Sequence, residues 1–453
     1  MIKTLEEAIS KKCLIEIFGV GYVGFPLAVR LATSGFKVVG IDNDENKIKR
    51  LQSNSLTDYE LYLKDEFFEC RKRSFQLSDS PTKSNSSKVG IICVPTPIQS
   101  KNGDSNLFVR ATVEKFLNFC NMGDVIIIES SIKIGTTEQM RNMIESKGFK
   151  VGKDVGLCYC PERIDPMNKD WTLENIPRVI YASDDVSFNV AQSVYHYVNN
   201  SHLIRVNSSK VAELVKSYEN SFRLVNISLV NELAVLCDRL GVDVNDVITA
   251  ASTKPFGFMA FYPSGGAGGH CIPKDPTFLS ETAKASGTQF STIDTALKIN
   301  SLMPIHIVSS IEKVITKLGL EKSALVCGLA YKPDIEDMRD SPGFRIVEEL
   351  KQKNFKVAAY DPYYKKELHK RYLQENNLSE LEFNALTSLD DSQLANFNCI
   401  CIVQHHAVIK SRLSAIYQRS LVPFIYDCQH KLIKNQKSKT ILNFYDYDIK
   451  ENL

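Results

Sequence analysis

The sequence predicts an α/β fold in which two Rossmann-like, doubly wound domains are joined by a long central helix and a helical middle domain. Three observations support this prediction. Short β-branched runs alternate with helical stretches over the first ~200 residues, the alternation stops near Ser208, and it returns after about Ser310. A chain of 453 residues has room for two or three domains. We therefore expect domains at residues 1–205, 206–310 and 311–453.

The first domain is predicted from five strand-like runs. These lie at residues 14–18, 37–41, 89–94, 125–129 and 156–160. Helical stretches separate them, which indicates a parallel sheet with helices on both faces. The polar segment 74–88 is expected to be a loop between elements.

The middle of the chain is predicted to contain one long amphipathic helix. Apolar residues recur at helical spacing from about residue 208 to residue 240, and no glycine or proline interrupts them. A helix of this length commonly joins domains or forms a subunit interface. The last domain is predicted from strand-like runs at residues 323–326, 356–359, 399–403 and 424–426.

Composition favours an ordinary soluble globular protein. Hydrophobic residues make up 43%, and the net charge of +2 gives no reason to expect nucleic acid or a membrane surface as a partner. The first twelve residues are charged and lack the apolar core of a signal peptide, so we expect a cytoplasmic protein. The twelve cysteines are then expected to be reduced, and the eight histidines show no ligand spacing, so no metal site is predicted.

A glycine-rich turn predicts a dinucleotide site. Gly19, Gly21 and Gly24 follow the first predicted strand and open a helix, as the G-x-G-x-x-G fingerprint requires. The pyrophosphate would lie at the helix N-terminus, where free N–H groups favour anions. Asp42 ends the next strand, where a carboxylate binds the ribose hydroxyls and repels a 2′-phosphate, which favours NAD over NADP. An ordinary glycine turn is the alternative. In the last domain only Gly328 of such a triplet is present, which suits a smaller nucleotide.

One short segment carries the features of a covalent catalyst. Four glycines lie within residues 265–269, Cys271 follows them, and Asp275 lies four residues further on. Glycines in such number indicate backbone close to a ligand. A cysteine thiolate can attack an aldehyde and hold it as a thiohemiacetal. A structural cysteine in a tight loop is an equally good interpretation from these residues alone.

Two further groups have the right chemistry for catalysis. Lys216 and Asn220 lie four positions apart on the long helix and share a face, where an ammonium and an amide can stabilise an oxyanion. Glu162 and Arg163 follow a predicted strand end, where ligand sites of parallel sheets gather. A solvated helix lysine and a charged surface turn are the respective alternatives.

Taken together, these motifs resemble the UDP-glucose/GDP-mannose dehydrogenase family over nearly the whole chain. The resemblance is carried, in family order, by Gly19-Val-Gly-Tyr-Val-Gly24, Val94-Pro-Thr-Pro97, Glu129-Ser-Ser-Ile132 with Gly135-Thr-Thr137, Cys160-Pro-Glu-Arg163, Ala212-Glu-Leu-Val-Lys216 with Glu219-Asn220, Gly268-Gly-His-Cys271 with Asp275, and Gly328-Leu-Ala-Tyr-Lys-Pro333 with Asp337, Arg339, Ser341 and Pro342.

The resemblance implies a four-electron oxidation with two NAD+ used in turn. A C6 alcohol becomes an aldehyde, which Cys271 captures, and water then releases the carboxylate from a thioester. Lys216 would stabilise the oxyanion with help from Asn220. Asp275 and Glu162 would serve proton transfer and water activation.

The resemblance also implies binding residues, a partner and an assembly. The cofactor would contact Gly19, Gly21, Tyr22, Val23, Gly24, Asp42, Pro95, Thr96, Ser131 and Thr136. The substrate would contact Arg163, Lys216, Phe261, Tyr262, Gly268, Lys332 and Arg339. The last domain would bind UDP, the long helix would form a homodimer, and the product would be a precursor of surface polysaccharide.

Within the family the sequence is most similar to the UDP-N-acetylglucosamine 6-dehydrogenases. Residues 252–258 and the pair Glu162-Arg163 carry this similarity. UDP-glucose, UDP-N-acetylgalactosamine and UDP-N-acetylmannosamine are the alternative substrates. A two-electron hydroxyacid dehydrogenase and a non-catalytic sugar-nucleotide binding protein are the alternatives outside the family. Gly266 stands where a proline is usual in this branch, and Ile134 replaces the usual proline before Gly135-Thr-Thr137. We expect the first change to loosen the active-site loop and the second to loosen the cofactor loop.

Overall fold

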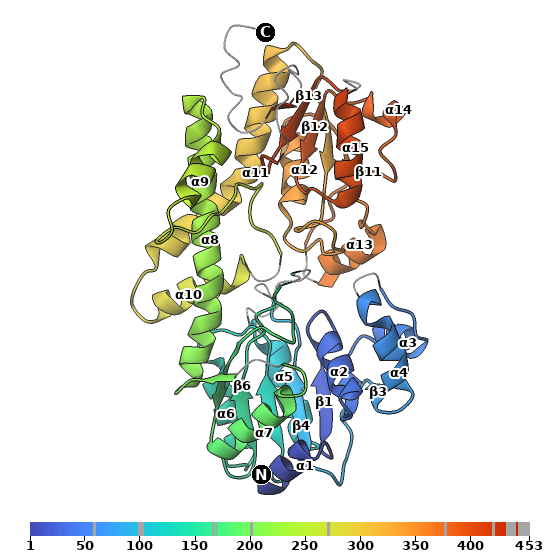
Figure 1. Cartoon of the computed structure of the whole chain (residues 1–453), viewed down its shortest axis with the longest axis vertical. Coiled ribbons are helices and arrows are strands. Elements are labelled where there is room, and N and C mark those ends of the chain that lie inside the picture. The colour runs from blue at the N-terminus through green and yellow to red at the C-terminus, as the bar shows by residue number, and fades with distance from the viewer. Residues whose placement is uncertain are drawn as a thin grey trace. The chain divides into compact units, whose positions relative to one another are not determined.

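The computed structural model describes residues 1–57, 60–97, 104–164, 168, 170–199, 203–269, 272–375, 378–418, 422–431 and 441–442. The chain divides into two compact units, Met1–Tyr218 and Glu219–Leu453. The division falls inside helix α8 (Ser209–Leu240), the long green helix of Figure 1. Within the described residues, no helix combines the length and the apolar character needed to cross a membrane.

The first unit is built on an eight-stranded sheet with the order β3-β2-β1-β4-β5-β6-β7-β8. All neighbouring strands are parallel except β6 and β7, which are antiparallel. The six strands from β3 to β6 have the 3-2-1-4-5-6 order of dinucleotide-binding folds. The strands are β1 (Leu14–Phe18), β2 (Lys37–Ile41), β3 (Phe75–Ser78), β4 (Lys88–Ile92), β5 (Val125–Ile128), β6 (Gly156–Tyr159), β7 (Arg178–Ala182) and β8 (Leu203–Arg205).

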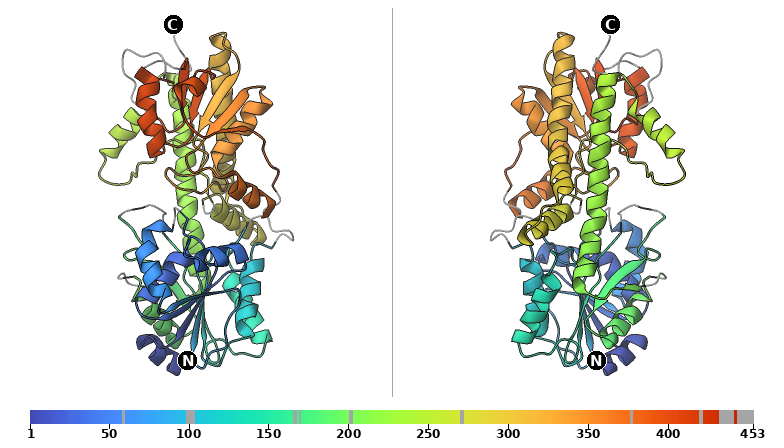
Figure 2. Two further views of the ribbon diagram at one scale, coloured as in Figure 1. Left: turned by 90° about the vertical axis from the view of Figure 1, so that its right-hand side faces the viewer. Right: turned by 90° about the vertical axis from the view of Figure 1, so that its left-hand side faces the viewer.

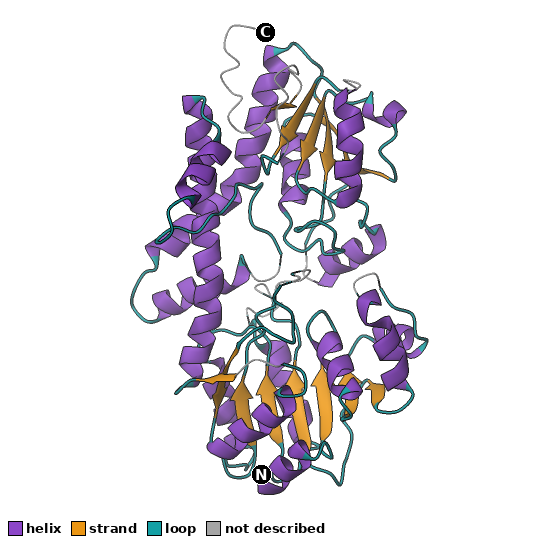
Figure 3. Cartoon of the chain, viewed as in Figure 1, coloured by secondary structure: helices purple, strands orange, loops and turns teal. Residues whose placement is uncertain are grey.

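Helices cover both faces of this sheet, as Figure 3 shows. They are α1 (Ile2–Ile9), α2 (Gly24–Thr33), α3 (Glu45–Gln52), α4 (Lys64–Arg71), α5 (Leu107–Leu117), α6 (Thr136–Ser146) and α7 (Asp185–Tyr195), with a short 3-10 turn at Leu61–Leu63. Side chains alternate along each strand, so Val125 and Ile127 join one apolar layer while Ile126 and Ile128 join the other. Burial on both faces explains why these strands are continuous apolar runs.

The second unit repeats the same strand order on a six-stranded parallel sheet, β11-β10-β9-β12-β13-β14. The strands are β9 (Ser323–Cys327), β10 (Lys356–Tyr360), β11 (Asn384–Leu386), β12 (Cys399–Ile402), β13 (Phe424–Asp427) and β14 (Ile441–Leu442). The helices of this unit after α8 are α9 (Val244–Ser252), α10 (Lys274–Ala285), α11 (Ser291–Lys317), α12 (Pro342–Gln352), α13 (Lys366–Glu375), α14 (Asp391–Leu394) and α15 (Ala407–Gln418).

The predicted fold class is confirmed, because both sheets are doubly wound and α8 begins and ends within one residue of its predicted limits. Figure 2 shows α8 running without a break. The prediction that segment 74–88 is a loop was wrong, because Phe75–Ser78 forms β3. Phe75 and Leu77 are buried while Gln76 is exposed, so the strand alternates over only four residues. Strands β7, β8, β11 and β14 were also not predicted.

Candidate functional site

The predicted glycine turn between β1 and α2 has the shape that a dinucleotide requires. Gly19 has φ 88°, and a Cβ there would lie 2.7 Å from the carbonyl oxygen of Cys93. A Cβ on Gly24 would lie 2.0 Å from the carbonyl oxygen of Gly19, so both positions need glycine for packing. Gly21 has no atom within 4 Å of an added Cβ, and no side chain caps the N-terminus of α2. This open backbone at the start of a helix fits a pyrophosphate, since the helix dipole favours an anion there.

Asp42 directly follows β2, beside this turn. Its Oδ2 accepts a hydrogen bond from the Val20 amide at 3.1 Å, and its Oδ1 accepts one from the Asp44 amide at 3.0 Å. The ammonium of Lys47 lies 2.8 Å from Oδ2. The carboxylate therefore joins the end of β2 to the glycine turn, and it has a cation beside it that the motif did not reveal.

The other predicted cofactor residues lie at the same edge of the sheet, where the parallel strands end. Tyr22 and Val23 complete the glycine turn. Exposed Pro95 and buried Thr96 follow β4, and the Thr96 hydroxyl donates to the carbonyl oxygen of Ser131 at 2.5 Å. Thr136 begins α6, and its hydroxyl accepts a hydrogen bond from Asn106 at 2.7 Å.

Glu213 on α8 holds the loop before α6 and was not among the predicted site residues. Its side chain is buried, and its two oxygens accept hydrogen bonds from the amides of Gly135 and Thr137 at 2.6 and 2.8 Å. Glu213 and Lys216 lie three positions apart on α8, so they share a helix face. This loop is fixed by a carboxylate even though Ile134 replaces the usual proline.

Lys216 and Glu162 are brought together in the first unit. The Lys216 ammonium donates to the carbonyl oxygen of Glu162 at 2.6 Å. The Glu162 carboxylate oxygen Oε1 accepts from the amides of Arg163 and Ile164 at 2.5 and 2.7 Å, which closes a tight turn. The Arg163 guanidinium donates to the carbonyl oxygen of Pro177 at 2.8 Å. Lys216 is thus a positioned lysine, in contrast to the alternative of a freely solvated one.

Asn220 and Asp275 are brought together in the second unit. The Asn220 amide donates to Asp275 Oδ2 at 2.6 Å, and both side chains are buried. The other oxygen of Asp275, Oδ1, is also buried and has no hydrogen-bond partner among the described residues. A buried carboxylate oxygen without a partner is suited to bind a water molecule.

The glycine-rich loop of the second unit packs against the segment that follows β9. A Cβ on Gly268 would lie 2.7 Å from the carbonyl oxygen of Asp340, and a Cβ on Gly269 would lie 2.7 Å from the Tyr331 ring. The Gly269 amide donates to the carbonyl oxygen of Arg339 at 2.9 Å. Cys271, the predicted nucleophile, lies just beyond this loop and outside the described residues.

Gly266 adopts a conformation that proline cannot. Its φ is 121°, whereas the proline ring fixes φ near −65°. Asn300 on α11 fastens the next residue, because its side chain accepts from the Ala267 amide at 2.6 Å and donates to the Ala267 carbonyl oxygen at 3.0 Å. These two hydrogen bonds order the loop without a proline.

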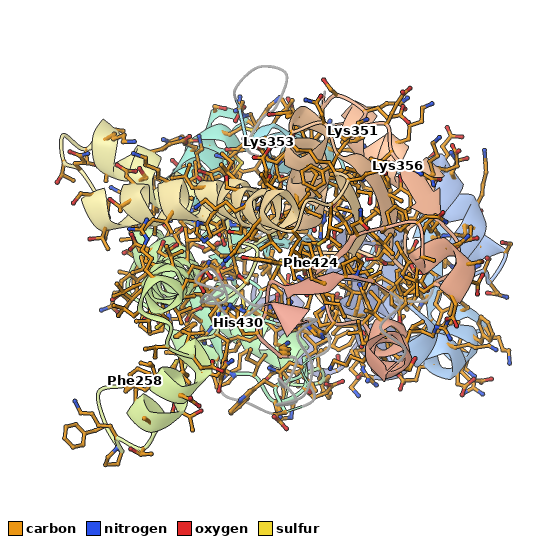
Figure 4. All side chains as sticks on the ribbon, turned by 90° about the horizontal axis from the view of Figure 1, so that it is seen from above. Phe258, Lys351, Lys353, Lys356, Phe424 and His430 are labelled. Carbon is orange, nitrogen blue, oxygen red and sulfur yellow. The ribbon has the colours of Figure 1, made fainter. Side chains whose placement is uncertain are left out.

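The remaining predicted substrate residues also lie in the second unit. Phe261 contacts Phe222 edge to face at 6.0 Å, and Tyr262 is 57% exposed. Lys332 is half-buried, and Arg339 forms an ion pair with Asp337 at 2.6 Å. Figure 4 shows Phe258 on the segment that follows α9, and residues 252–260 are all exposed.

A second nucleotide-type turn follows β9. Gly328 has φ 93°, and a Cβ there would lie 2.6 Å from the backbone nitrogen of Gln404, which follows β12. Asp361, after β10, accepts from the amides of Leu329 and Ala330 at 2.7 and 2.8 Å. Asp361 thus occupies in the second sheet the position that Asp42 occupies in the first sheet. It was missed, although it follows the second strand of its sheet as Asp42 does.

Five of the described cysteines are poor nucleophiles. Burial raises the pKa of Cys160 to about 12 and raises the pKa values of Cys93, Cys158, Cys399 and Cys428 well above the ordinary range. The thiolate is the reactive form, so these residues behave as small core side chains. Among the described residues, no group of three or more histidine, cysteine or acidic side chains is placed to hold a metal ion.

Comparison with known proteins identifies the family. Residues 13–199 match the NAD binding domain of the UDP-glucose/GDP-mannose dehydrogenase family, residues 210–302 match its central domain, and residues 325–434 match its UDP binding domain. The chain belongs to this family. It is an NAD-dependent nucleotide-sugar dehydrogenase, and the resemblance drawn from its motifs is confirmed.

Individual dehydrogenases are similar to this one over most of its length. It is 32% identical over 420 residues to the UDP-N-acetyl-D-mannosamine dehydrogenase of Methanococcus vannielii, covering 91% of this chain and 90% of that protein. It is 33% identical over 360 residues to the UDP-N-acetyl-D-glucosamine 6-dehydrogenase of Pseudomonas aeruginosa, covering 78% and 83%. The solved structure of the UDP-D-ManNAc dehydrogenase of Pyrococcus horikoshii gives a TM-score of 0.83 at 28% identity, with 96% and 100% covered.

Asp42→Ala is expected to weaken NAD+ binding and to relax the preference of the dehydrogenase for NAD+ over NADP+. Loss of a hydrogen bond to a charged group costs about 1.5–3 kcal/mol, so the KM for NAD+ should rise about tenfold or more. The substitution also frees Lys47, whose ammonium lies 2.8 Å from the Asp42 carboxylate, to attract a 2′-phosphate. Steady-state kcat/KM for both cofactors measures the preference.

Lys47 supplies the control for this prediction. In the double variant Asp42→Ala/Lys47→Met the gain with NADP+ should disappear, while the loss with NAD+ remains. Equal use of NAD+ and NADP+ by the unchanged enzyme would show that Asp42 does not select the cofactor.

Proposed function

We propose that this dehydrogenase oxidises the C6 alcohol of a UDP-N-acetylhexosamine to the carboxylate, with Cys271 as covalent catalyst. The observation that carries the proposal is the setting of Asp275, four residues after Cys271. One carboxylate oxygen accepts a hydrogen bond from Asn220, and the other is buried without a hydrogen-bond partner among the described residues. A two-electron alcohol dehydrogenase has no need of a water-activating carboxylate beside a cysteine. Hydrolysis of a covalent thioester intermediate is accelerated by one.

Each residue of the proposed mechanism has a separate task. When bound, NAD accepts a hydride in each of the two oxidations. The Cys271 thiolate attacks the C6 aldehyde, and the negative oxygen that forms accepts hydrogen bonds from the Lys216 ammonium. After the second oxidation C6 is a thioester. Asp275 orients a water molecule and takes its proton as the water attacks, and the thiolate leaves.

Glu162 makes contacts in this structure that its motif does not suggest. Its carboxylate closes a turn through two backbone amides, and its carbonyl oxygen holds Lys216. We propose that it positions the lysine, in addition to the role in proton transfer that the family resemblance implies.

An N-acetylated sugar is supported by the similar enzymes. UDP-N-acetylmannosamine is the substrate named for the Methanococcus vannielii and Pyrococcus horikoshii enzymes, which align with nearly all of this chain. UDP-N-acetylglucosamine is named for the Pseudomonas aeruginosa enzyme, and segment 252–258 of the sequence predicts the same sugar. We propose UDP-N-acetylmannosamine as the first sugar to test and UDP-N-acetylglucosamine as the second.

We further propose that the enzyme is a cytoplasmic homodimer that makes precursors of surface polysaccharide. Its domains are proposed to be residues 1–205, 206–310 and 311–453. The dimer is supported by exposed apolar side chains that recur along α8, since an exposed apolar stripe on a helix marks an interaction surface. They are Val211, Leu214, Tyr218, Phe222, Leu229, Leu236 and Leu240.

A panel of UDP-sugars tests the proposal. NADH and product carboxylate are counted together for UDP-N-acetylmannosamine, UDP-N-acetylglucosamine, UDP-N-acetylgalactosamine and UDP-glucose. The expected result is two NADH per carboxylate and a higher kcat/KM for an N-acetylated sugar. One NADH per product would overturn the four-electron mechanism in favour of a two-electron dehydrogenase. A ranking led by UDP-glucose would overturn the N-acetyl preference alone.

Asp275→Asn is expected to slow hydrolysis of the thioester more than the first oxidation. An amide keeps the shape of the side chain but cannot take a proton from water. Quenched reactions analysed by intact-protein mass spectrometry should therefore show more covalent adduct on the variant than on the unchanged enzyme. If no adduct accumulates and the first oxidation slows equally, Asp275 has only a structural role.

A further inference from the structure

A fully buried arginine lies behind the turn that holds Lys216. Arg178 begins β7, and its side chain is 0% exposed. The register of β6 and β7 pairs Cys158 with Ala182 and Tyr159 with Tyr181 in antiparallel fashion. Extended by three residues beyond Tyr159 and Tyr181, the same register would set Glu162 opposite Arg178. The antiparallel direction of β7 therefore delivers an arginine to the edge where β5 and β6 end, which is the edge of the cofactor site.

Arg178 lies between two carboxylates. Its Nη2 is 3.0 Å from Glu129 Oε2 and 3.5 Å from Glu162 Oε2. The same nitrogen donates to the carbonyl oxygen of Cys160 at 3.3 Å, and the guanidinium lies 4.5 Å from the centre of the Tyr195 ring. The Tyr195 hydroxyl donates to Glu129 Oε1. Residues that follow β5 and β6 thus meet the first residue of β7 and the last residue of α7 in one buried charged cluster.

The cost of this cluster to the fold points to a functional role. Arg178 Nε and Nη1 are buried and have no hydrogen-bond partner among the described residues. Burial, together with the nearby Glu162, raises the pKa of Glu129. A buried ion pair is often no more stable than apolar side chains of the same volume, so stability alone does not explain why an arginine stands here.

The cluster reaches Lys216 through one residue. Glu162 Oε2 faces Arg178, while Glu162 Oε1 accepts from the amides of Arg163 and Ile164 and so fixes the turn. The carbonyl oxygen of the same residue accepts from the Lys216 ammonium at 2.6 Å. An ammonium has three N–H donors, so this bond fixes the direction of the other two.

We propose that Arg178 is a positioning residue for Lys216, and that it acts by holding the Glu162 carboxylate so that the Glu162 carbonyl oxygen aims the ammonium at the reacting C6 oxygen. The inference rests on the proposed function for the role of Lys216. Without Arg178, the carboxylates of Glu129 and Glu162 would face each other in a buried site. The turn would then shift, and Lys216 would lose its anchor while both nucleotide sites remain.

Arg178→Met is the first test, with NADH formation as the assay. A displacement of about 1 Å in a catalytic group can cost about 10²-fold in rate, so kcat should fall by about tenfold to a hundredfold. The KM values for NAD+ and UDP-sugar should stay within about threefold, since no contact to either nucleotide changes. Arg178→Lys keeps the charge and should recover part of the lost kcat. A matched control is Arg205→Met. Arg205 also pairs with a carboxylate, that of Asp185 at 2.8 Å, and also lies over an aromatic ring, that of Phe188 at 4.8 Å. Unlike Arg178, it lies at the surface.

A double-mutant cycle with Lys216→Ala separates positioning from general damage. If Arg178 acts through Lys216, Arg178→Met should slow the Lys216→Ala enzyme by less than about threefold. A purely structural arginine would lower kcat by the same factor in both backgrounds, and that result would overturn the proposal. If Arg178→Met does not give folded protein, judged by its thermal unfolding, Arg178→Lys is carried through the same cycle with the same two outcomes. The cycle compares rates of NADH formation and does not depend on how many NADH are formed per product. A yield of one NADH per product would therefore overturn the proposed function, while the cycle would still test whether Arg178 acts through Lys216.

Discussion

Cys271→Ser is expected to abolish four-electron turnover while both nucleotides still bind. The substitution lies outside the glycine turn at Gly19, the turn at Gly328 and the glycines that pack on Tyr331. A serine hydroxyl is scarcely ionised near neutral pH, whereas a thiol with a pKa near ~8.5 already supplies some thiolate. An ester also hydrolyses less readily than a thioester. Residual activity should therefore stop after one hydride transfer or at a trapped ester.

The measurement is the number of NADH formed per product carboxylate, with binding of NAD+ and UDP-sugar followed by calorimetry. Cys120→Ser is a suitable control, because Cys120 is only partly buried and lies after α5, outside the site residues. It should keep two NADH per carboxylate. If Cys271→Ser also formed two NADH per carboxylate at close to the unchanged rate, the covalent mechanism would be wrong.

Long, strongly patterned elements could be predicted from the sequence, and short edge elements could not. Strand β5 is an unbroken apolar run because helices bury both of its faces, and such a run is visible without neighbours. Helix α8 has 32 residues, and apolar side chains recur at helical spacing along it. Strand β3 has only four residues at the edge of its sheet, and its polar flanks made the whole segment look like a loop. Its assignment depends on pairing with β2, which a single sequence does not display.

The residues of the site were predictable where a motif fixes their spacing along the chain. The glycine turn and Asp42 belong to one local pattern, so their proximity followed from the fold class. The partner of Lys216 did not follow, because it is a backbone carbonyl oxygen 54 positions earlier in the chain. Lys47 was missed because it approaches Asp42 from the helix after β2, and nothing in the fingerprint specifies it.

Arg178 shows most clearly why part of a site stays hidden in the sequence. A charged residue at the start of a short strand is normally exposed, so an isolated arginine gives no signal. Its burial depends on the reversal of β7 relative to β6 and on two carboxylates, Glu129 and Glu162, that follow β5 and β6. Those three conditions arise only when the sheet is assembled.

Lys216→Ala is expected to slow both oxidations, because a negative charge develops on the C6 oxygen before each hydride leaves. Loss of one such donor typically costs about 10²–10³ in rate. The effect should fall on kcat more than on the KM for UDP-sugar, since the ammonium interacts most strongly with charge that exists only in the transition state. Single-turnover measurements of both steps, started from the alcohol and from the aldehyde, test whether both are slowed.

The same substitution should change the reactivity of Cys271 if the two residues act on one carbon. A nearby ammonium lowers the pKa of a thiol, so alkylation of Cys271 by iodoacetamide near neutral pH should be slower in Lys216→Ala than in the unchanged enzyme. Lys210→Ala is the matched control, because Lys210 lies exposed on the same helix. It should alter neither the alkylation rate nor turnover. If Lys216→Ala slows turnover and leaves alkylation untouched, the lysine serves the oxyanion without activating the thiol. If it slows neither, Lys216 does not act at the reacting carbon, and its bond to Glu162 only fastens α8 to the turn after β6.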